Sequence, residues 1–493
     1  MDNLTTKQRL TFDPKMWSKL AVCAAIIIIF WIVPPVAPIT AIGMKVIGVF
    51  IGVVLMLSLV DTVWPAMLAI ILLSRTGAAT VNEVIAGSMG NWVIYFILMS
   101  FILTHALNES GFTDRIVAKF MGMKFVMRSP WTFTISVGVL GLLLGAFMDQ
   151  VPATAFMLAF CGRVYKELGY TGKDTYPNIC SIIAVYSVNI GGAMTPISHP
   201  LAMIGIAIYE GIVGEALSLF SYLAFGVPTG IILFIVFCVL MRLVAKPDMS
   251  KFKDFKIENV LKKQGPMDLR EKITVTVFFL TVAVWMLPGI LSMFIKAPWV
   301  STFSSFGITF WAILSVVVMS LISVNGKPIV NAKEVVNKNI NWGILMFISI
   351  GVYLGSVMSF ESTGIVAAIQ EFVVPITQQV PATITALILA TAAVLMTNFA
   401  SNTTTVTVMT TVGATLALGS GGALNVVGLS LVATMCGSCA YFLPSSFAPI
   451  AMLHADEYSN RNKILAFGAV MIVITSLVVG LLGYPIGSML VGG

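Results

Sequence analysis

Uncharged polar residues interrupt a very apolar stretch of the chain between Thr397 and Met409. Hydrocarbon tolerates such groups only where each has a hydrogen-bonding partner. Two interpretations are open: the polar groups join buried helices to one another, or they hold a small polar ligand. The centre of the stretch, Ser401-Asn402-Thr403, is the first candidate for ligand contact.

A second polar interruption, Asp149-Gln150-Val151, lies about 250 residues earlier in another apolar stretch. Each interruption is followed by a Gly- and Pro-containing break, at 191–200 and at 438–449, and each is preceded by an Asn-Trp pair, Asn91-Trp92 or Asn341-Trp342. Landmarks in the same order predict an internal repeat. Five expected spans separate equivalent points, and an odd number inverts the second copy relative to the first.

The elements that must position these residues are membrane helices. The composition is 58% hydrophobic and 10% charged, with a mean hydropathy of +0.98, which excludes a soluble domain of this size. The net charge of +7 does not indicate nucleic-acid binding, because Lys and Arg are confined to connecting segments. The six Cys residues show neither a zinc-ligand spacing nor a disulfide framework.

The fold prediction is an all-α polytopic membrane protein with about 11 transmembrane helices and two re-entrant hairpins in an inverted repeat. The hairpins are expected at 131–161 and 383–420. The expected spans are 20–38, 41–58, 62–78, 91–107, 178–208, 217–243, 272–295, 300–323, 341–360, 426–453 and 464–488. This arrangement places all but three of the 28 Lys and Arg residues on one side. The positive-inside rule then predicts a cytoplasmic N-terminus and an external C-terminus.

Five parts are expected along the chain. They are first-repeat scaffold helices with an interfacial arm (1–130), a first-repeat transport part (131–244), a solvated cytoplasmic linker (245–271), second-repeat scaffold helices with an arm (272–380), and a second-repeat transport part (381–493). The arms, near 112–125 and 364–372, show the helical alternation of charged and apolar residues that favours the membrane interface.

Breaks in membrane helices carry chemistry because they leave backbone groups unpaired. A half-helix start presents N–H groups that favour anions, and a half-helix end presents carbonyls that favour cations such as sodium. Two tips and two broken spans meeting at one place could therefore hold a carboxylate ligand with few charged side chains.

On these residues the chain resembles the divalent anion:sodium symporter family of di- and tricarboxylate and sulfate transporters. Ser401-Asn402-Thr403 matches the family's Ser-Asn-Thr tip, and Leu443-Pro444 followed by small polar residues resembles its last broken span. The resemblance implies an elevator-type transporter, a homodimer, and a sodium ion beside each tip. It implies substrate contacts at Ser401, Asn402, Thr403, Asp149, Gln150, Val151, Ser198, His199, Ser446 and Phe447, and a cation site at Thr397, Ala400, Asn402 and Ser446.

The first half departs from the family pattern, with Asp149-Gln150-Val151 at the tip, Gly145 four residues before it, and His199 where the family usually has Thr. Three interpretations are open. Asp149 and a protonated His199 could pair and replace the first sodium ion; Asp149 could bind a proton or a cation during transport; or the two side chains could cap separate helices.

The predicted function is secondary active transport of small di- or tricarboxylate anions of the 2-oxoglutarate, succinate, malate or citrate type, by exchange or by cation-coupled symport. The same architecture could instead carry sulfate or an amino acid, and a channel is a further alternative. A membrane-embedded enzyme is disfavoured, because no Ser/His/Asp set or His-Glu-x-x-His helix occurs. The expected location is a bacterial inner or plasma membrane, the expected partners are the anion, lipid and a second copy, and no cofactor beyond sodium is expected.

Overall fold

The computed structural model describes residues 13–252, 255, 257–261, 265–295, 297–372, 375 and 379–491. This part of the chain is almost entirely helical, and its only strands form a short hairpin, β1 (Ser323–Val324) paired antiparallel with β2 (Lys327–Pro328). Within it, nine helices are long and apolar enough to cross a membrane, or eleven if each bent pair counts as one span. The prediction of an all-α polytopic membrane protein is confirmed. Residues 1–12 and part of the linker lie outside the described residues.

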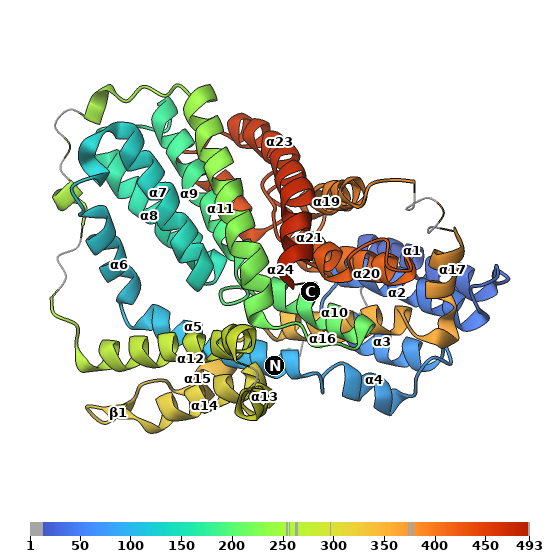
Figure 1. The fold of residues 1–493 in the computed structure, drawn as a ribbon. Helices are drawn as coiled ribbons and strands as arrows, with labels where there is room; N and C mark the ends of the chain where they lie inside the picture. The colour runs from blue at the N-terminus through green and yellow to red at the C-terminus, as the bar shows by residue number, and fades with distance from the viewer. Residues whose placement is uncertain are drawn as a thin grey trace, which may run out of the picture.

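The first half consists of long and short helices joined by short turns (Figure 1). They are α1 (Pro14–Ile32), α2 (Ala41–Leu59), α3 (Trp64–Ser74), α4 (Val81–Gly87), α5 (Trp92–Glu109), α6 (Phe112–Met121), α7 (Pro130–Phe147), α8 (Gln150–Glu167), α9 (Thr175–Met194), α10 (Pro200–Val213) and α11 (Leu219–Val244). In Figure 1, α7, α8, α9 and α11 stand side by side, and α5 runs across their lower ends.

The second half follows a similar order after the linker. Its helices are α12 (Leu269–Phe294), α13 (Pro298–Ser305), α14 (Gly307–Leu321), α15 (Ala332–Lys338), α16 (Trp342–Met358), α17 (Ile365–Phe372), α19 (Ala382–Phe399), α20 (Asn402–Gly419), α21 (Val426–Gly437), α22 (Ala448–Ala455), α23 (Arg461–Leu477) and, after a π-helical turn at Val478–Gly483, α24 (Tyr484–Val491).

Two expected spans are shorter than the sequence suggested. The span predicted at 62–78 is α3, whose 11 residues rise only about 17 Å at ~1.5 Å per residue, too little for about 30 Å of hydrocarbon. Pro65 lies in its first turn, and after the helix ends at Ser74 the chain turns at Gly77, which has a φ of 89° that favours glycine. The span predicted at 426–453 is likewise divided into α21, with 12 residues, and α22, with eight.

Both expected hairpins are pairs of helices joined by a two-residue break. In the first pair α7 ends at Phe147 and α8 begins at Gln150; in the second pair α19 ends at Phe399 and α20 begins at Asn402. The polar interruptions of the sequence therefore lie at the starts of α8 and α20. The broken span expected at 178–208 is also observed, as α9 and α10 separated by residues 195–199, which form a turn at 196–198 and end at His199.

The linker differs from the solvated segment that its charges predicted. Phe252 and Phe255 pack against Phe133 of α7 with ring centroids 5.5 and 5.6 Å apart, and Ile257 and Val260 are only 2% and 8% exposed. Apolar residues between the Lys residues are buried because α7 and α9 leave an apolar face uncovered. The described part of the linker is therefore fastened to the first helical hairpin.

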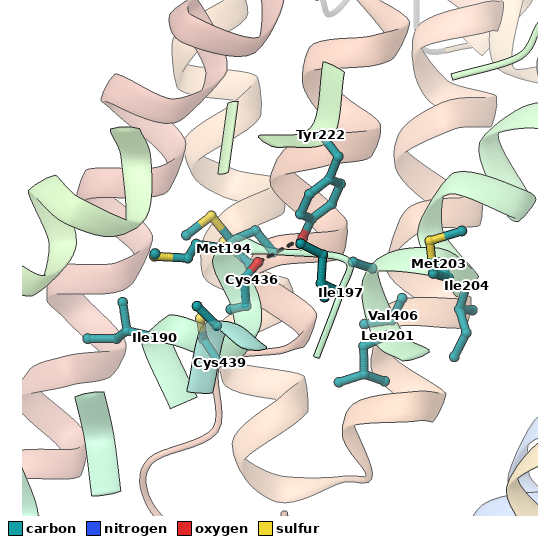
Figure 2. Packing of buried hydrophobic residues seen from close by; sticks show 14 of the residues in the cluster. Ile190, Met194, Ile197, Leu201, Met203, Ile204, Tyr222, Val406, Cys436 and Cys439 are labelled. Carbon is teal, nitrogen blue, oxygen red and sulfur yellow. Dashed lines mark hydrogen bonds between the residues drawn. The ribbon is translucent and has the colours of Figure 1, made fainter. Parts of the chain in front are cut away.

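A single large apolar core joins the two broken helices. Figure 2 shows Met194 and Ile197, at the first break, packed near Cys436 and Cys439 of the second, with Val406 of α20 alongside. In the same core the hydroxyl of Tyr222 on α11 donates to the carbonyl of Ala193 at 2.8 Å. The two breaks, far apart in sequence, are thereby held in one place.

Candidate functional site

A cavity of about 880 Å³ lies where the two hairpin tips and the two helix breaks meet α2, α5 and α16. It is large enough for a small organic ligand and its water. Its lining residues are Leu57, Ser58, Thr62, Phe101, Thr104, His105, Asn108, Glu109, Asp149, Val151, Pro152, His199, Pro200, Asn339, Asn341, Ile344, Phe347, Ser401, Asn402, Thr403, Pro444, Ser445, Ser446, Phe447 and Ala448. Eight of the ten predicted substrate contacts are among them; Gln150 and Ser198 are not.

Three oxygen atoms converge at the second tip. The Thr397 hydroxyl lies 2.9 Å from Oδ1 of Asn402 and 2.5 Å from the carbonyl oxygen of Gly437, and Thr397 is fully buried. A hydroxyl has one proton, so it cannot satisfy both acceptors fully. Such a set of neutral oxygens suits a hard monovalent cation. Asn402 is also held from its other side, since its Nδ2 donates to the Ser438 carbonyl at 3.3 Å.

The break after α21 is held by side chains along its whole length. Six consecutive carbonyl oxygens, those of residues 437 to 442, each lie within hydrogen-bonding distance of a different side chain. Those side chains are, in order, Thr397, Asn402, Asn398, Asn189, Tyr186 and His454. Because these bonds replace the helical ones, the extended backbone does not leave its carbonyls unpaired in an apolar core.

Asn398 does the most to fix this break. It is fully buried, its Oδ1 accepts from the N–H groups of Tyr441 and Phe442 at 2.6 and 2.8 Å, and its Nδ2 donates to Val394 and Cys439. An amide side chain has two donors and two acceptor positions, and all four are used here. Asn398 therefore holds the segment that leads to Ser445 and Ser446.

The first tip is built differently. Oδ1 of Asp149 accepts from the Val151 N–H at 2.9 Å, so Asp149 is the N-cap of α8. Gln150 is 1% exposed and turns away from the cavity, its Nε2 donating to the Asn189 carbonyl at 3.2 Å. Gly145 cannot be replaced by a hydroxyl-bearing residue, because a Cβ there would lie within 2.1 Å of the Val188 carbonyl.

His199 and Asp149 both line the cavity, but each caps its own helix. The Leu201 N–H donates to Nδ1 of His199 at 3.3 Å, which makes His199 the N-cap of α10. Neither residue is hydrogen-bonded or ion-paired to the other among the described contacts. Of the three interpretations drawn from the sequence, the structure matches separate helix caps.

The remaining predicted residues lie close to the second break. Ser446 is 4% exposed and donates to the Leu443 carbonyl at 2.6 Å, while Ala400 is the extended residue that ends α19. The ring of Phe447 meets the ring of His199 edge to face at 5.7 Å, which brings the two breaks into contact across the cavity floor. Ser198 lies elsewhere, in a recess against α5.

A further part of the cavity wall comes from α5. α5 contributes Thr104, His105, Asn108 and Glu109, none of which was among the predicted substrate contacts. Their positions at i, i+1, i+4 and i+5 on an otherwise apolar helix are the signal that could have identified them. Among the described residues that line the cavity, two are acidic, two are His and none is Lys or Arg.

Helix starts around the cavity differ between the halves. α8 and α10 are capped by Asp149 and His199, whereas α20 and α22 begin after Ser401 and Phe447 with no side-chain cap among the described contacts. Uncapped N–H groups at a helix start favour anions. The arrangement, with open helix starts beside a set of convergent neutral oxygens in a membrane protein, is that of an ion-handling membrane transporter.

Comparison with known proteins agrees with this class. The family model described as citrate transporter, CitMHS, matches residues 52–436, which is more than half of the chain. The chain therefore belongs to the CitMHS citrate transporter family, and the resemblance to divalent anion:sodium symporters is confirmed. Membership of a transporter family also means that the protein is a transporter rather than an enzyme.

Curated relatives cover most of the chain at low identity. A protein of Staphylococcus saprophyticus subsp. saprophyticus named sodium-dependent dicarboxylate transporter SdcS is 26% identical over 420 residues, 82% of this chain and 78% of the relative. The Staphylococcus aureus protein of the same name is 23% identical over 439 residues, 86% of this chain and 81% of its own length. Among solved structures, the YdaH transporter of Alcanivorax borkumensis has a TM-score of 0.53 at 13% identity, covering 81% of this chain and 86% of that one, which is a likeness of fold alone.

Proposed function

We propose that the protein is a secondary active transporter of small dicarboxylate or tricarboxylate anions, with the anion bound at the second tip and break. The observation that carries the proposal is the pair of uncapped helix starts, at α20 and α22, on the wall of one cavity. Ser401, Asn402 and Thr403 at the first of these, and Ser445 and Ser446 at the second, offer N–H and O–H donors to carboxylate oxygens. The names of the staphylococcal relatives support a dicarboxylate.

One sodium ion is proposed to couple transport, at Thr397, Ala400, Asn402 and Ser446 with the Gly437 carbonyl. The convergence of the Thr397, Asn402 and Gly437 oxygens fits such an ion. The first half does not offer the same set, because the Gln150 amide points its Nε2 at the Asn189 carbonyl and Gly145 has no side chain. A chain with a single cation site is proposed to work either as a symporter with one sodium ion or as an exchanger.

The proposed movement is that of an elevator, with the hairpins and broken helices as the moving part of a homodimer in a bacterial inner or plasma membrane. Among the described residues, two hydrogen bonds cross from α2 and α5 to this part: Ser58 meets Thr404 at 2.6 Å, and Trp92 donates to Glu210 at 3.0 Å. α16 faces it with small residues, Gly351 next to Thr407 and Gly355 next to Thr411. An interface with small residues and few polar contacts would allow the hairpins and broken helices to slide along α2, α5 and α16.

A second candidate substrate class is an amino dicarboxylate. The described cavity lining contains Asp149 and Glu109 and neither Lys nor Arg, so a dianion meets two like charges there. A substrate with an ammonium group would neutralise part of that charge.

Uptake into proteoliposomes tests these proposals together. Vesicles are preloaded with succinate, 2-oxoglutarate, malate, citrate, aspartate or nothing, and radiolabelled uptake is followed with an inward sodium gradient or with choline. Sodium-driven uptake into empty vesicles supports symport, and sodium-independent uptake only into preloaded vesicles supports exchange. Absence of uptake for every carboxylate, with transport of sulfate instead, would overturn the substrate proposal.

A further inference from the structure

A small recess lies beside the main cavity, between α5 and the break of the first broken helix. Its volume is about 10 Å³, and it is lined on one side by α5 and on the other by residues 196–200 and Met203. The α5 residues are Phe96, Ile97, Ser100, Phe101 and Thr104. Most of this lining is apolar, which makes its few polar atoms conspicuous.

Two hydroxyl groups in the recess have no partner among the described residues. The Ser198 side chain is 5% exposed, and its Oγ is buried without a hydrogen bond; Oγ of Ser100, from the opposite wall, is in the same situation. Buried hydroxyls nearly always have a partner, and leaving one unpaired is costly. One hydrogen-bonding partner located between the two walls could satisfy both hydroxyls.

We propose that one ordered water molecule occupies this recess and bridges Ser100 to Ser198. A water needs about 10–15 Å³ of accessible space and two to four polar partners. The recess has about that volume, and Thr104, which lines both the recess and the main cavity, provides a third hydroxyl on the same wall. No di- or tricarboxylate fits a space of this size.

The bridge gives Ser198 a role different from substrate contact. Ser198 directly precedes His199, whose ring lines both spaces and whose Nδ1 caps α10. Holding the Ser198 hydroxyl against α5 fixes the backbone that sets the direction of the His199 ring. Ser198 and Ser100 are therefore positioning residues, joined through solvent, for the first-half wall of the substrate cavity. This assignment is independent of which anion is carried.

A double-mutant cycle in the full-length protein tests the bridge. The variants S100A, S198A and S100A/S198A are compared for the midpoint of thermal unfolding and, in proteoliposomes, for half-saturating substrate concentration and maximal rate. Because losing either anchor releases the same water, each single variant is expected to raise the half-saturating concentration about three- to tenfold, and the double variant no further than the larger single effect. The maximal rate should change less than twofold.

The matched control is S349A, which removes a buried hydroxyl already bonded within its own helix, to Met346. It is expected to behave as wild type in half-saturating concentration. An experimental map that resolves water should show a peak within hydrogen-bonding distance of both Ser100 and Ser198. Additive effects of S100A and S198A, wild-type behaviour of both, or a map that resolves water elsewhere and none in the recess would each overturn the proposal. The midpoints of thermal unfolding of the two single variants and the double variant test the bridge even if no carboxylate is transported, because non-additive changes support it and additive changes contradict it.

Discussion

The break between α9 and α10 and the break between α21 and α22 differ in how their unpaired backbone groups are satisfied. Around the second break, six consecutive carbonyls are matched by six side chains, and the helix starts at α20 and α22 are left uncapped. Around the first break, the helix starts are capped by Asp149 and His199, while Gln150 Oε1, Asn189 Oδ1 and Ser198 Oγ have no partner among the described residues. In the second half, side chains pair with the backbone carbonyls and the N–H groups at the helix starts remain available for a ligand. In the first half, side chains of the protein itself accept hydrogen bonds from the N–H groups at the helix starts.

This difference supports the proposal that the two halves contribute unequally to binding of the anion. At the start of α8 the carboxylate of Asp149 already accepts a hydrogen bond from the helix backbone, as an anionic ligand could at an uncapped helix start. The first half is therefore proposed to act as a wall of the site, and the second half as its binding surface. The predictions that follow separate these two roles.

The largest effect is expected for N402A. The change removes Oδ1 from the oxygen set around Thr397 and the donor to the Ser438 carbonyl, so binding of both ion and substrate should suffer. Uptake is expected to fall at least about a hundredfold, which corresponds to about 2.7 kcal/mol or more. Proteoliposome uptake measures it, with size-exclusion profile and thermal midpoint as checks of folding. Retained uptake in N402A would assign the binding surface to another part of the cavity.

A large difference in stability is expected between N398A and Q150A. N398A leaves the Tyr441 and Phe442 N–H groups and the Cys439 carbonyl without their partner in a buried segment, and should lower unfolding stability by about 3 kcal/mol. Q150A removes one long bond to the Asn189 carbonyl and should cost about 1 kcal/mol for the polar interaction. Thermal unfolding in one detergent compares them; equal losses would remove the distinction between the breaks.

Sodium dependence should distinguish the halves further. T397V keeps the shape of the side chain and removes its hydroxyl, so the sodium concentration for half-maximal uptake is expected to rise about tenfold, about 1.4 kcal/mol. The position matched to Thr397 in the first half is Gly145, which has no side chain, so the control is Q150L, which removes a buried polar group at the first tip and should leave that concentration unchanged. If Q150L raises it as much as T397V does, the first half also binds a cation and the proposed single-site coupling is wrong. Unchanged sodium dependence in T397V would remove the site from the second half.

The smallest effects are expected at the two caps. D149A should cost about 1 kcal/mol of stability and D149N much less, because Asn caps a helix about as well as Asp. Since Asp149 and His199 cap separate helices, the exchanged variant D149H/H199D should show no rescue relative to the single changes. Restored uptake in the exchanged variant would show that the two side chains pair during transport.

The sequence predicted the helix breaks well because their signals are chemical. Polar residues in an apolar run have to lie at a break or a site, and Asp149 and Ser401 are indeed the residues just before α8 and α20. It predicted side-chain direction less well. Gln150 and Ser198 turn away from the cavity because the backbone at a break follows neither the helical nor the extended repeat, so position along the chain does not set a face.

Other features depend on contacts that a single sequence does not reveal. The polar face of α5 at Thr104, His105 and Asn108 becomes a cavity wall only because the tips approach it. α3 ends at Ser74, before the turn at Gly77, although the apolar run continues in the sequence. The buried linker residues depend on an apolar face that α7 and α9 leave open.

The packing of the linker has a mechanical consequence. Phe252 and Phe255 pack against Phe133 of α7. At the other end of the linker, Arg115 of α6 donates to the Gly265 carbonyl and to both carboxylate oxygens of Glu271, at 2.6 to 2.7 Å. The covalent connection between the halves is thus anchored at two points that belong to different helices. The described part of the linker and Arg115 thereby tie the first hairpin and α6 to the start of α12.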